Sequence, residues 1–152
     1  MKNKGHKIIA VNKKAYHNYF IDQTYEAGIV LAGSEVKSVR MGKINLRDAY
    51  CKILKGELFL IGCHISAYEK GSHFNPEETR SRKLLMHRTE IDKLRGKVEQ
   101  KSFTLVPTKA YFNQGLLKIE IGLAHGKELH DKRKTIKDRD IARDVQREIS
   151  RI

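Results

Sequence analysis

Residues 102–124, SFTLVPTKAYFNQGLLKIEIGLA, decide the fold that we predict for this chain. Two runs rich in β-branched, aromatic and aliphatic side chains, Ser102–Phe112 and Gly115–Ala124, flank the dipeptide Asn113-Gln114. Runs of this composition on either side of a short polar turn are typical of a β-hairpin. We therefore predict an antiparallel hairpin in the second half of the chain.

Further strands are predicted on the N-terminal side of this hairpin. A second pair, Ile44–Leu54 and Glu57–Ile65, is joined at Lys55-Gly56 and is rich in Ile, Leu, Phe and Tyr. The run Phe20–Leu31 predicts a longer strand, in which Gly28 suggests a bulge or a bend of the kind found at barrel corners. With a first strand at His6–Val11, about six strands predict a mainly β fold, an OB-like closed antiparallel barrel with a few short flanking helices.

Three helices and one long loop complete the predicted body. Lys13–Tyr19 follows Asn12, a good N-cap, and Ser34 could cap a short helix that Gly42 closes. A third helix, from about Thr89 to Gln100, would bury Ile91, Leu94 and Val98. Residues 66–82 contain Asn75-Pro76 and one glycine, Gly71, which predict a loop.

The charge of the chain favours a polyanionic partner. Lys and Arg number 31 against 18 Asp and Glu, a formal net charge of +13. Such an excess most often serves nucleic-acid binding. We do not expect membrane binding, because the chain has no Trp and no run near the roughly 20 apolar residues of a spanning helix.

The cysteines and the N-terminus predict a cytoplasmic protein. The apolar run near the N-terminus is too short for a signal peptide. Cys51 and Cys63 suit a reducing cytosol. In a hairpin centred on Lys55-Gly56, Cys51 would face about Leu60 and Cys63 about Asp48, so the two thiols would not oppose each other.

Motifs for catalysis, metals or cofactors are not found in the sequence. The seven histidines lack zinc-ligand spacing, and no Walker A loop, GxSxG or GxGxxG occurs. We therefore expect no metal, no cofactor and no enzyme activity. An RNA-processing enzyme remains an alternative, for which His87 with Lys83 and Glu90 is the best acid–base cluster; without chemistry the same residues would form an RNA-contacting loop.

Basic clusters carry the stronger signal. Three groups could hold phosphates: Arg80, Arg82 and Lys83; Lys37, Arg40 and Lys43; and Lys132, Arg133 and Lys134. Tyr16, Tyr19 and His130 are candidate stacking groups beside basic residues. Any single cluster could be an ordinary solvated face, but three of them in a chain of this charge favour nucleic acid.

The last quarter of the chain predicts a separate basic tail. A helix from about Ile136 would carry one thin apolar stripe and, beside it, a row of arginines: Ile141, Val145, Ile149 and Ile152, and Arg139, Arg143, Arg147 and Arg151. Like charges four residues apart disfavour the free helix. We expect a tail that is disordered or weakly helical when free and folds against an anionic partner; a solvated helix packed by its Ile/Val stripe is the alternative.

Several segments resemble the SsrA-binding protein family, also called small protein B, which is the bacterial partner of transfer-messenger RNA. They are NKKAYHNYFI (12–21), YEAGIVLAGSEVKSVRMGKINLRDAY (25–50), RSRKLLMHRTEI (80–91) and IGLAHGKELHDKRKTIKDRD (121–140). The resemblance covers nearly the whole chain. It implies an OB-like RNA-binding barrel in residues 1–126 and, in residues 127–152, a basic tail that folds on the ribosome.

The resemblance also implies a function. Family members bind the tRNA-like domain of transfer-messenger RNA and bring it to stalled ribosomes for trans-translation. Elongation factor Tu and alanyl-tRNA synthetase act on the same RNA. The tail is expected to enter the empty mRNA channel, which is lined by small-subunit rRNA, near the decoding centre.

Site residues follow from the matching positions. Four of them match family positions on the surface for the tRNA-like domain: Glu26, Leu85, His87 and Lys118. Beside them, Lys13, Lys37, Arg40, Arg80, Arg82 and Lys83 fit as phosphate contacts, and Tyr19 is added as a stacking candidate. His130 matches the residue that stacks on a decoding-centre base, and the ribosome-contacting motif continues through Asp131, Lys132, Arg133, Ile136, Lys137 and Arg139. A general RNA-binding or ribosome-assembly protein is the alternative among binders.

Overall fold

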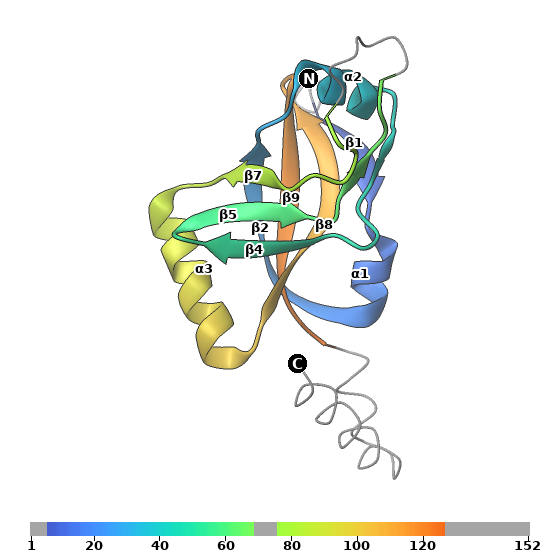
Figure 1. Ribbon diagram of the computed structural model, residues 1–152. Helices are drawn as coiled ribbons and strands as arrows, with labels where there is room; N and C mark the ends of the chain where they lie inside the picture. The colour runs from blue at the N-terminus through green and yellow to red at the C-terminus, as the bar shows by residue number, and fades with distance from the viewer. Residues whose placement is uncertain (1–5, 69–75, 127–152) are drawn as a thin grey trace, which may run out of the picture.

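A computed structural model describes residues 6–68 and 76–126 of the chain, which form a β-barrel with three helices on its surface (Figure 1). The elements follow one another as β1 (His6–Val11), α1 (Lys13–Asn18), β2 (Tyr19–Ile29), α2 (Gly33–Arg40), β3 (Ile44–Asn45), β4 (Tyr50–Leu54), β5 (Glu57–Ile61), β6 (His64–Ile65), β7 (Arg82–Leu85), α3 (Arg88–Lys101), β8 (Thr104–Asn113) and β9 (Leu116–Gly126).

The barrel closes because β8 and β9 pair with each other at the two ends of the strand order. Antiparallel pairing runs β8-β4-β5-β7-β2-β9, and β9 returns to β8. β1 adds to β8 on the side where β4 also pairs. The prediction of a mainly β, OB-like closed antiparallel barrel is therefore confirmed.

Alternating apolar residues fill the barrel. Leu58, Leu60 and Leu84 point inward with Ile119 and Ile121, and all five are at most 1% exposed. The predicted inner face of α3 is confirmed, since Ile91 and Leu94 are buried and Val98 packs against the same core. The burial of this many aliphatic side chains is the main favourable term in the stability of the fold.

Both predicted hairpin turns exist. At Lys55-Gly56 the two residues have φ values of 52° and 79°, and at Gln114-Gly115 they have 52° and 82°. Two consecutive positive φ values are the geometry of a type I′ turn, which matches the twist of the flanking strands. The second turn lies one residue later than predicted. The predicted register of β4 and β5 is also correct, since Cys51 pairs with Leu60. This ladder ends at Tyr50 and Ile61, so Cys63 and Asp48 do not form the predicted strand pair. Both cysteines are buried and free.

The predicted strands Ile44–Leu54 and Glu57–Ile65 are each broken in two. β3 and β6 leave the barrel and form a small sheet of their own. Gly62 marks one break with φ +81°, and a Cβ at this glycine would lie 3.1 Å from the Asp48 carbonyl oxygen. This close approach explains why a continuous strand was the wrong prediction.

Two local predictions were also incorrect. Ala32, not Ser34, is the N-cap of α2, because the Glu35 carboxylate accepts a hydrogen bond of 2.9 Å from the Ala32 amide. Strand β7 was not predicted; it begins at Arg82, the last residue of the predicted loop, and in it Arg82 and Leu84 are buried while Lys83 and Leu85 are exposed. In contrast, Asn12 caps α1 as predicted, accepting from the Ala15 amide.

Candidate nucleic-acid interface

One outer face of the barrel brings together residues that are far apart in the sequence. In the strand register, Leu85 pairs with Gly28, Gly28 with Lys118, Lys118 with Tyr111, and Tyr111 with Ile8. These residues form a row across β7, β2, β9, β8 and β1, which we call the outer row. Leu85 and Ile8 are 52% and 50% exposed, so the row has an apolar group at each end and a lysine between them.

The glycine in the outer row leaves the face open. A Cβ at Gly28 would lie 3.5 Å from the Leu85 Cβ, so any side chain here would stand against Leu85. No side chain of Gly28 therefore stands between Leu85 on β7 and Lys118 on β9. The three strands β7, β2 and β9 thus present an apolar side chain and a cation on either side of a glycine, which suits contact with both a base and its phosphate.

Glu26 lies beside the outer row, opposite Glu120 on β9. The Tyr111 hydroxyl donates a hydrogen bond to the Glu26 carboxylate, and the Thr108 hydroxyl donates one of 2.7 Å to Glu120. Burial, with the hydrogen bond to Glu26, raises the pKa of Tyr111 above its ordinary value. The phenol therefore stays protonated and orients the exposed Glu26 carboxylate.

His6 and Tyr111 were not predicted as site residues. The two rings stack with centroids 4.8 Å apart and an interplanar angle of 9°. Nothing local in the sequence joins these residues, because only the pairing of β1 with β8 brings them together. A period-two pattern along β1 could have placed His6 on the same face as Ile8.

His87 and Lys83 lie at the two ends of the segment that contains Leu85. His87 is exposed and is the N-cap residue of α3, although its side chain makes no cap hydrogen bond. Lys83 Nζ lies 3.1 Å from Glu57 on the neighbouring strand β5. Because Lys83 pairs with Glu57, the geometry does not favour the acid–base cluster of His87, Lys83 and Glu90.

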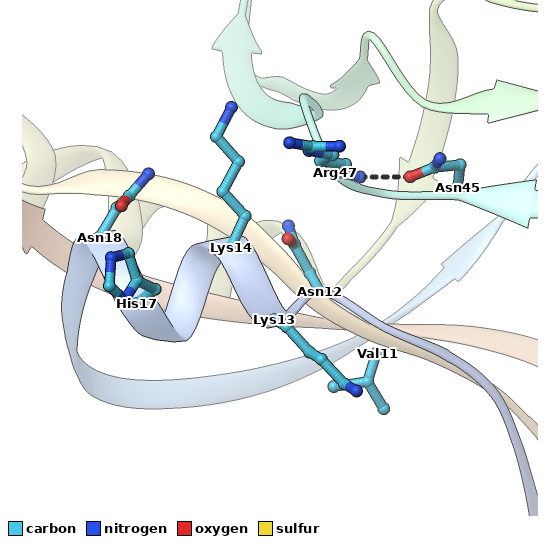
Figure 2. A pocket seen from close by; sticks show the side chains of 8 residues that line it. All are labelled: Val11, Asn12, Lys13, Lys14, His17, Asn18, Asn45 and Arg47. Carbon is cyan, nitrogen blue, oxygen red and sulfur yellow. Dashed lines mark hydrogen bonds between the residues drawn. The ribbon is translucent and has the colours of Figure 1, made fainter.

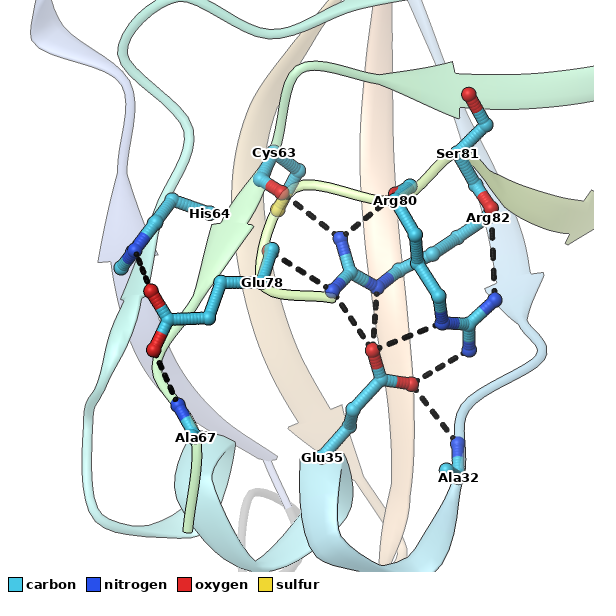
Figure 3. A network of polar contacts seen from close by, with 9 residues as sticks. All are labelled: Ala32, Glu35, Cys63, His64, Ala67, Glu78, Arg80, Ser81 and Arg82. Atoms are coloured by element: carbon cyan, nitrogen blue, oxygen red, sulfur yellow. Dashed lines mark hydrogen bonds and ion pairs between the residues drawn. The ribbon is translucent and has the colours of Figure 1, made fainter. Parts of the chain in front are cut away.

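Figure 3 shows a network of charged side chains around Glu35. Both oxygens of this carboxylate, which is 4% exposed, accept hydrogen bonds from two guanidinium groups. Arg80 Nη2 lies 2.6 Å and Arg82 Nη2 2.7 Å from it. Arg82 also donates to the carbonyl oxygens of Cys63 and Glu78, at 2.8 and 3.0 Å.

This network corrects one predicted site residue. Arg82 is 0% exposed, so it cannot serve as the predicted phosphate contact and instead ties β7 to α2. Arg80 is also paired with Glu35, but its side chain is 32% exposed. Burial alone would raise the pKa of Glu35; the hydrogen bonds from Arg80, the Ala32 amide and Arg82 outweigh it, and the pKa is lowered.

Lys13 lies at a basic pocket beside α1 (Figure 2). The pocket is lined by Val11, Asn12, Lys13, Lys14, His17, Asn18, Asn45 and Arg47. Asn12 is fixed in the lining of this pocket, because its side-chain amide donates to the Leu46 and Pro107 carbonyl oxygens at 2.9 and 2.8 Å.

Tyr19, the predicted stacking residue, is partly buried. It packs against the small cluster of Ala15, Val106 and Ala124 rather than beside the outer row.

The predicted basic residues of α2 are exposed. Lys37 Nζ lies 5.5 Å from the centre of the Tyr68 ring, and Arg40 lies 5.9 Å from that of Phe112. Figure 1 places α2 at the top of the barrel, away from α1 and α3. The predicted phosphate contacts of α2 therefore lie apart from Lys13 on α1 and do not form one compact patch with it.

Some predictions concern residues outside the described ranges. These are the tail residues His130, Asp131, Lys132, Arg133, Ile136, Lys137 and Arg139. Within residues 6–68 and 76–126, no group of three or more His, Cys, Asp or Glu side chains is arranged to hold a metal ion. Over the same ranges, no helix combines the length and hydropathy needed to cross a membrane.

A closed OB-like barrel with an apolar, aromatic and cationic outer face defines a small protein of the oligonucleotide-binding barrel class. The family model described as SmpB protein matches residues 9–151. The chain is 59% identical over 143 residues to the SsrA-binding protein of Syntrophotalea carbinolica, covering 94% of this chain and 95% of that one. It is 55% identical over 141 residues to the SsrA-binding protein of Thermoanaerobacter pseudethanolicus, covering 93% and 90%.

A solved structure described as "tmRNA-SmpB: a journey to the center of the bacterial ribosome" is similar in fold and sequence. Its TM-score is 0.66, its sequence identity is 49%, and the match covers 80% of this chain and 85% of that one. With the family match, this shows that the chain belongs to the SmpB family of SsrA-binding proteins.

Proposed function

We propose that this protein binds the tRNA-like domain of transfer-messenger RNA and brings it to stalled ribosomes for trans-translation. The observation that carries the proposal is the outer row, in which Leu85 and Lys118 flank Gly28 on one face of the sheet, with Glu26 two residues before Gly28 on β2. The family match and a similar structure described as a tmRNA-SmpB structure support the same assignment.

Each of these side chains has a distinct task on an RNA surface. Leu85 offers an exposed apolar contact for an unstacked base, and Lys118 offers a cation for a phosphate. The Glu26 carboxylate, held by Tyr111, accepts hydrogen bonds from base or ribose donors. Recognition of this kind reads the shape and the unpaired bases of a folded RNA rather than a duplex sequence.

The C-terminal segment has a separate role in the proposal. Residues 1–126 form the RNA-binding barrel and residues 127–152 form a basic tail that enters the empty mRNA channel near the decoding centre. The support is its sequence, with an arginine row that suits rRNA phosphates. A full-length message would exclude the tail, which would explain selection for stalled ribosomes.

The role is binding without catalysis, in the cytoplasm, with elongation factor Tu and alanyl-tRNA synthetase acting on the same RNA. Incubation of the full chain with labelled RNA and Mg²⁺ tests the first point. Turnover of the RNA would favour the processing enzyme instead, and unchanged RNA would favour the binding protein.

The division of labour between barrel and tail is tested by two matched variants. Replacing Ile136 and Arg139 by Ala should leave the affinity for transfer-messenger RNA intact and abolish peptide tagging on stalled ribosomes. Replacing Lys118 by Ala should lower the RNA affinity itself. A loss of RNA affinity in the tail variant would count against the division.

A further inference from the structure

The stacked rings of His6 and Tyr111 lie at the β1 end of the outer row. The RNA contacts proposed above do not include this stack. Tyr111 is 7% exposed, and its ring lies parallel to the His6 imidazole at 4.8 Å. His6 is itself exposed. The imidazole therefore covers the phenol, and the stack ends at the surface of the protein.

The strand register places this stack beside the proposed RNA contacts. Tyr111 pairs directly with Lys118 on one side and with Ile8 on the other. His6 precedes Ile8 by two residues on the same strand, so both side chains lie on the same face of the sheet. The Tyr111 hydroxyl donates to Glu26. Tyr111 thus contacts the His6 ring through its own ring and Glu26 through its hydroxyl, and it is the strand partner of Lys118.

We propose that His6 is a base-stacking residue, on which an unpaired nucleotide of the bound RNA continues the Tyr111–His6 stack. The inference rests on the proposed function and adds to it the residue His6 and the unpaired nucleotide that this residue would contact. The base packs on the outer face of the imidazole, Lys118 meets a neighbouring phosphate, and Glu26 accepts from a base or ribose donor. Every base has an aromatic face, so His6 contributes affinity with little choice of sequence.

Two simpler roles for His6 make different predictions. As a cover for Tyr111, His6 would affect the fold and not RNA binding. As a cation near Lys118, it would act on a phosphate, and lysine would replace it. A stacking residue needs a ring, and phenylalanine supplies one without a charge.

The test measures the affinity of the full chain for a transcript of the tRNA-like domain, using His6→Ala, His6→Phe and His6→Lys. Stacking of one base accounts for about tenfold in affinity, so we expect His6→Ala and His6→Lys to bind roughly tenfold more weakly. His6→Phe should bind within about twofold of the wild type. In His6→Ala, the slope of log affinity against log salt should stay unchanged, because no phosphate contact is lost.

Three results would overturn the inference. They are an unchanged affinity in His6→Ala, a loss in His6→Phe as large as that in His6→Ala, and rescue by lysine but not by phenylalanine. His64→Ala is the matched control, because this half-exposed histidine lies on β6, outside the proposed RNA surface. Urea unfolding of each variant shows whether the fold is retained. If His6→Ala destabilises β1, the comparison of His6→Phe with His6→Lys still tests stacking.

The wild-type measurement separates this inference from the proposed function. If the wild type prefers the tRNA-like transcript to an unrelated RNA of equal length, the proposed function stands and the His6 series tests stacking alone. If it shows no preference, the proposed function fails whatever the His6 variants do.

Discussion

Replacing Glu35 by Gln removes a carboxylate that neutralises two guanidinium groups at the junction of α2 and β7. Arg82 is 0% exposed and would keep its charge without a counter-ion, while Arg80 is 32% exposed and can be screened by water. Removal of one partner from a buried ion pair costs about 3–5 kcal/mol. For a domain of this size, that loss lowers the melting temperature by roughly 10–20 °C.

The same region offers a matched control. Glu57 pairs with Lys83 at 3.1 Å, but both side chains are about half exposed, at 50% and 44%. The same change, Glu57→Gln, should therefore cost at most about 1 kcal/mol, because an exposed pair is weak in water. Urea unfolding followed by circular dichroism gives the free energy of unfolding of both variants at neutral pH.

The pH dependence gives a second readout of the same network. The folded pKa of Glu35 lies below its ordinary value of 4.5, so ionised Glu35 stabilises the fold above that pH. This contribution is lost as the pH falls through the lowered folded value. We expect the difference in stability between the wild type and Glu35→Gln to shrink as the pH falls below 4.5. A cost equal to that of Glu57→Gln, or a difference independent of pH, would refute the reasoning.

Three further predictions concern the RNA face and the helix cap. Leu85→Ala should weaken binding of the tRNA-like domain about tenfold, as for loss of one base contact, with little change in stability because Leu85 is 52% exposed. Tyr111→Phe removes the donor to Glu26 and should weaken RNA binding several-fold, measured by the same titration, while retaining its stack with His6. Asn12→Asp keeps the α1 cap acceptor but loses two buried donors, and should lower the free energy of unfolding by about 2–4 kcal/mol in urea. Unchanged RNA affinity in the first two variants, or unchanged stability in the third, would contradict them.

Local signals in the sequence were enough to predict most of the barrel. The Lys55-Gly56 turn and the alternating strands beside it gave the correct register, down to the pairing of Cys51 with Leu60. Asn12 predicted the start of α1, because a side-chain acceptor is needed where helix amides have no partner.

The elements that were missed depend on buried charge and on contacts between distant strands. The basic residues Arg82 and Lys83 made the start of β7 resemble an exposed loop. An arginine is rarely buried without a charged partner, and the sequence does not show which residue that partner is. That partner, Glu35, lies on α2, where a glutamate normally predicts an exposed position. Gly62 breaks a strand through its approach to Asp48, and a sequence gives no direct sign of such an approach.

The candidate site was predicted in part, and mainly through resemblance to the family. Glu26, Leu85 and Lys118 lie on three strands, and composition alone does not relate them. Their grouping follows from the register across Gly28. The stack of His6 on Tyr111 could not be predicted from local patterns, since the β1–β8 pairing that joins the two residues is a long-range contact.

The most direct test of the central claim is to recover and sequence the RNA that copurifies with the full chain, for the wild type and for Leu85→Ala combined with Lys118→Ala. The account predicts one dominant RNA with a tRNA-like end and an internal reading frame in the wild type, and its loss in the double variant. A broad mixture of ribosomal and messenger fragments, equal in both proteins, would contradict the assignment of the outer row as the RNA-binding face.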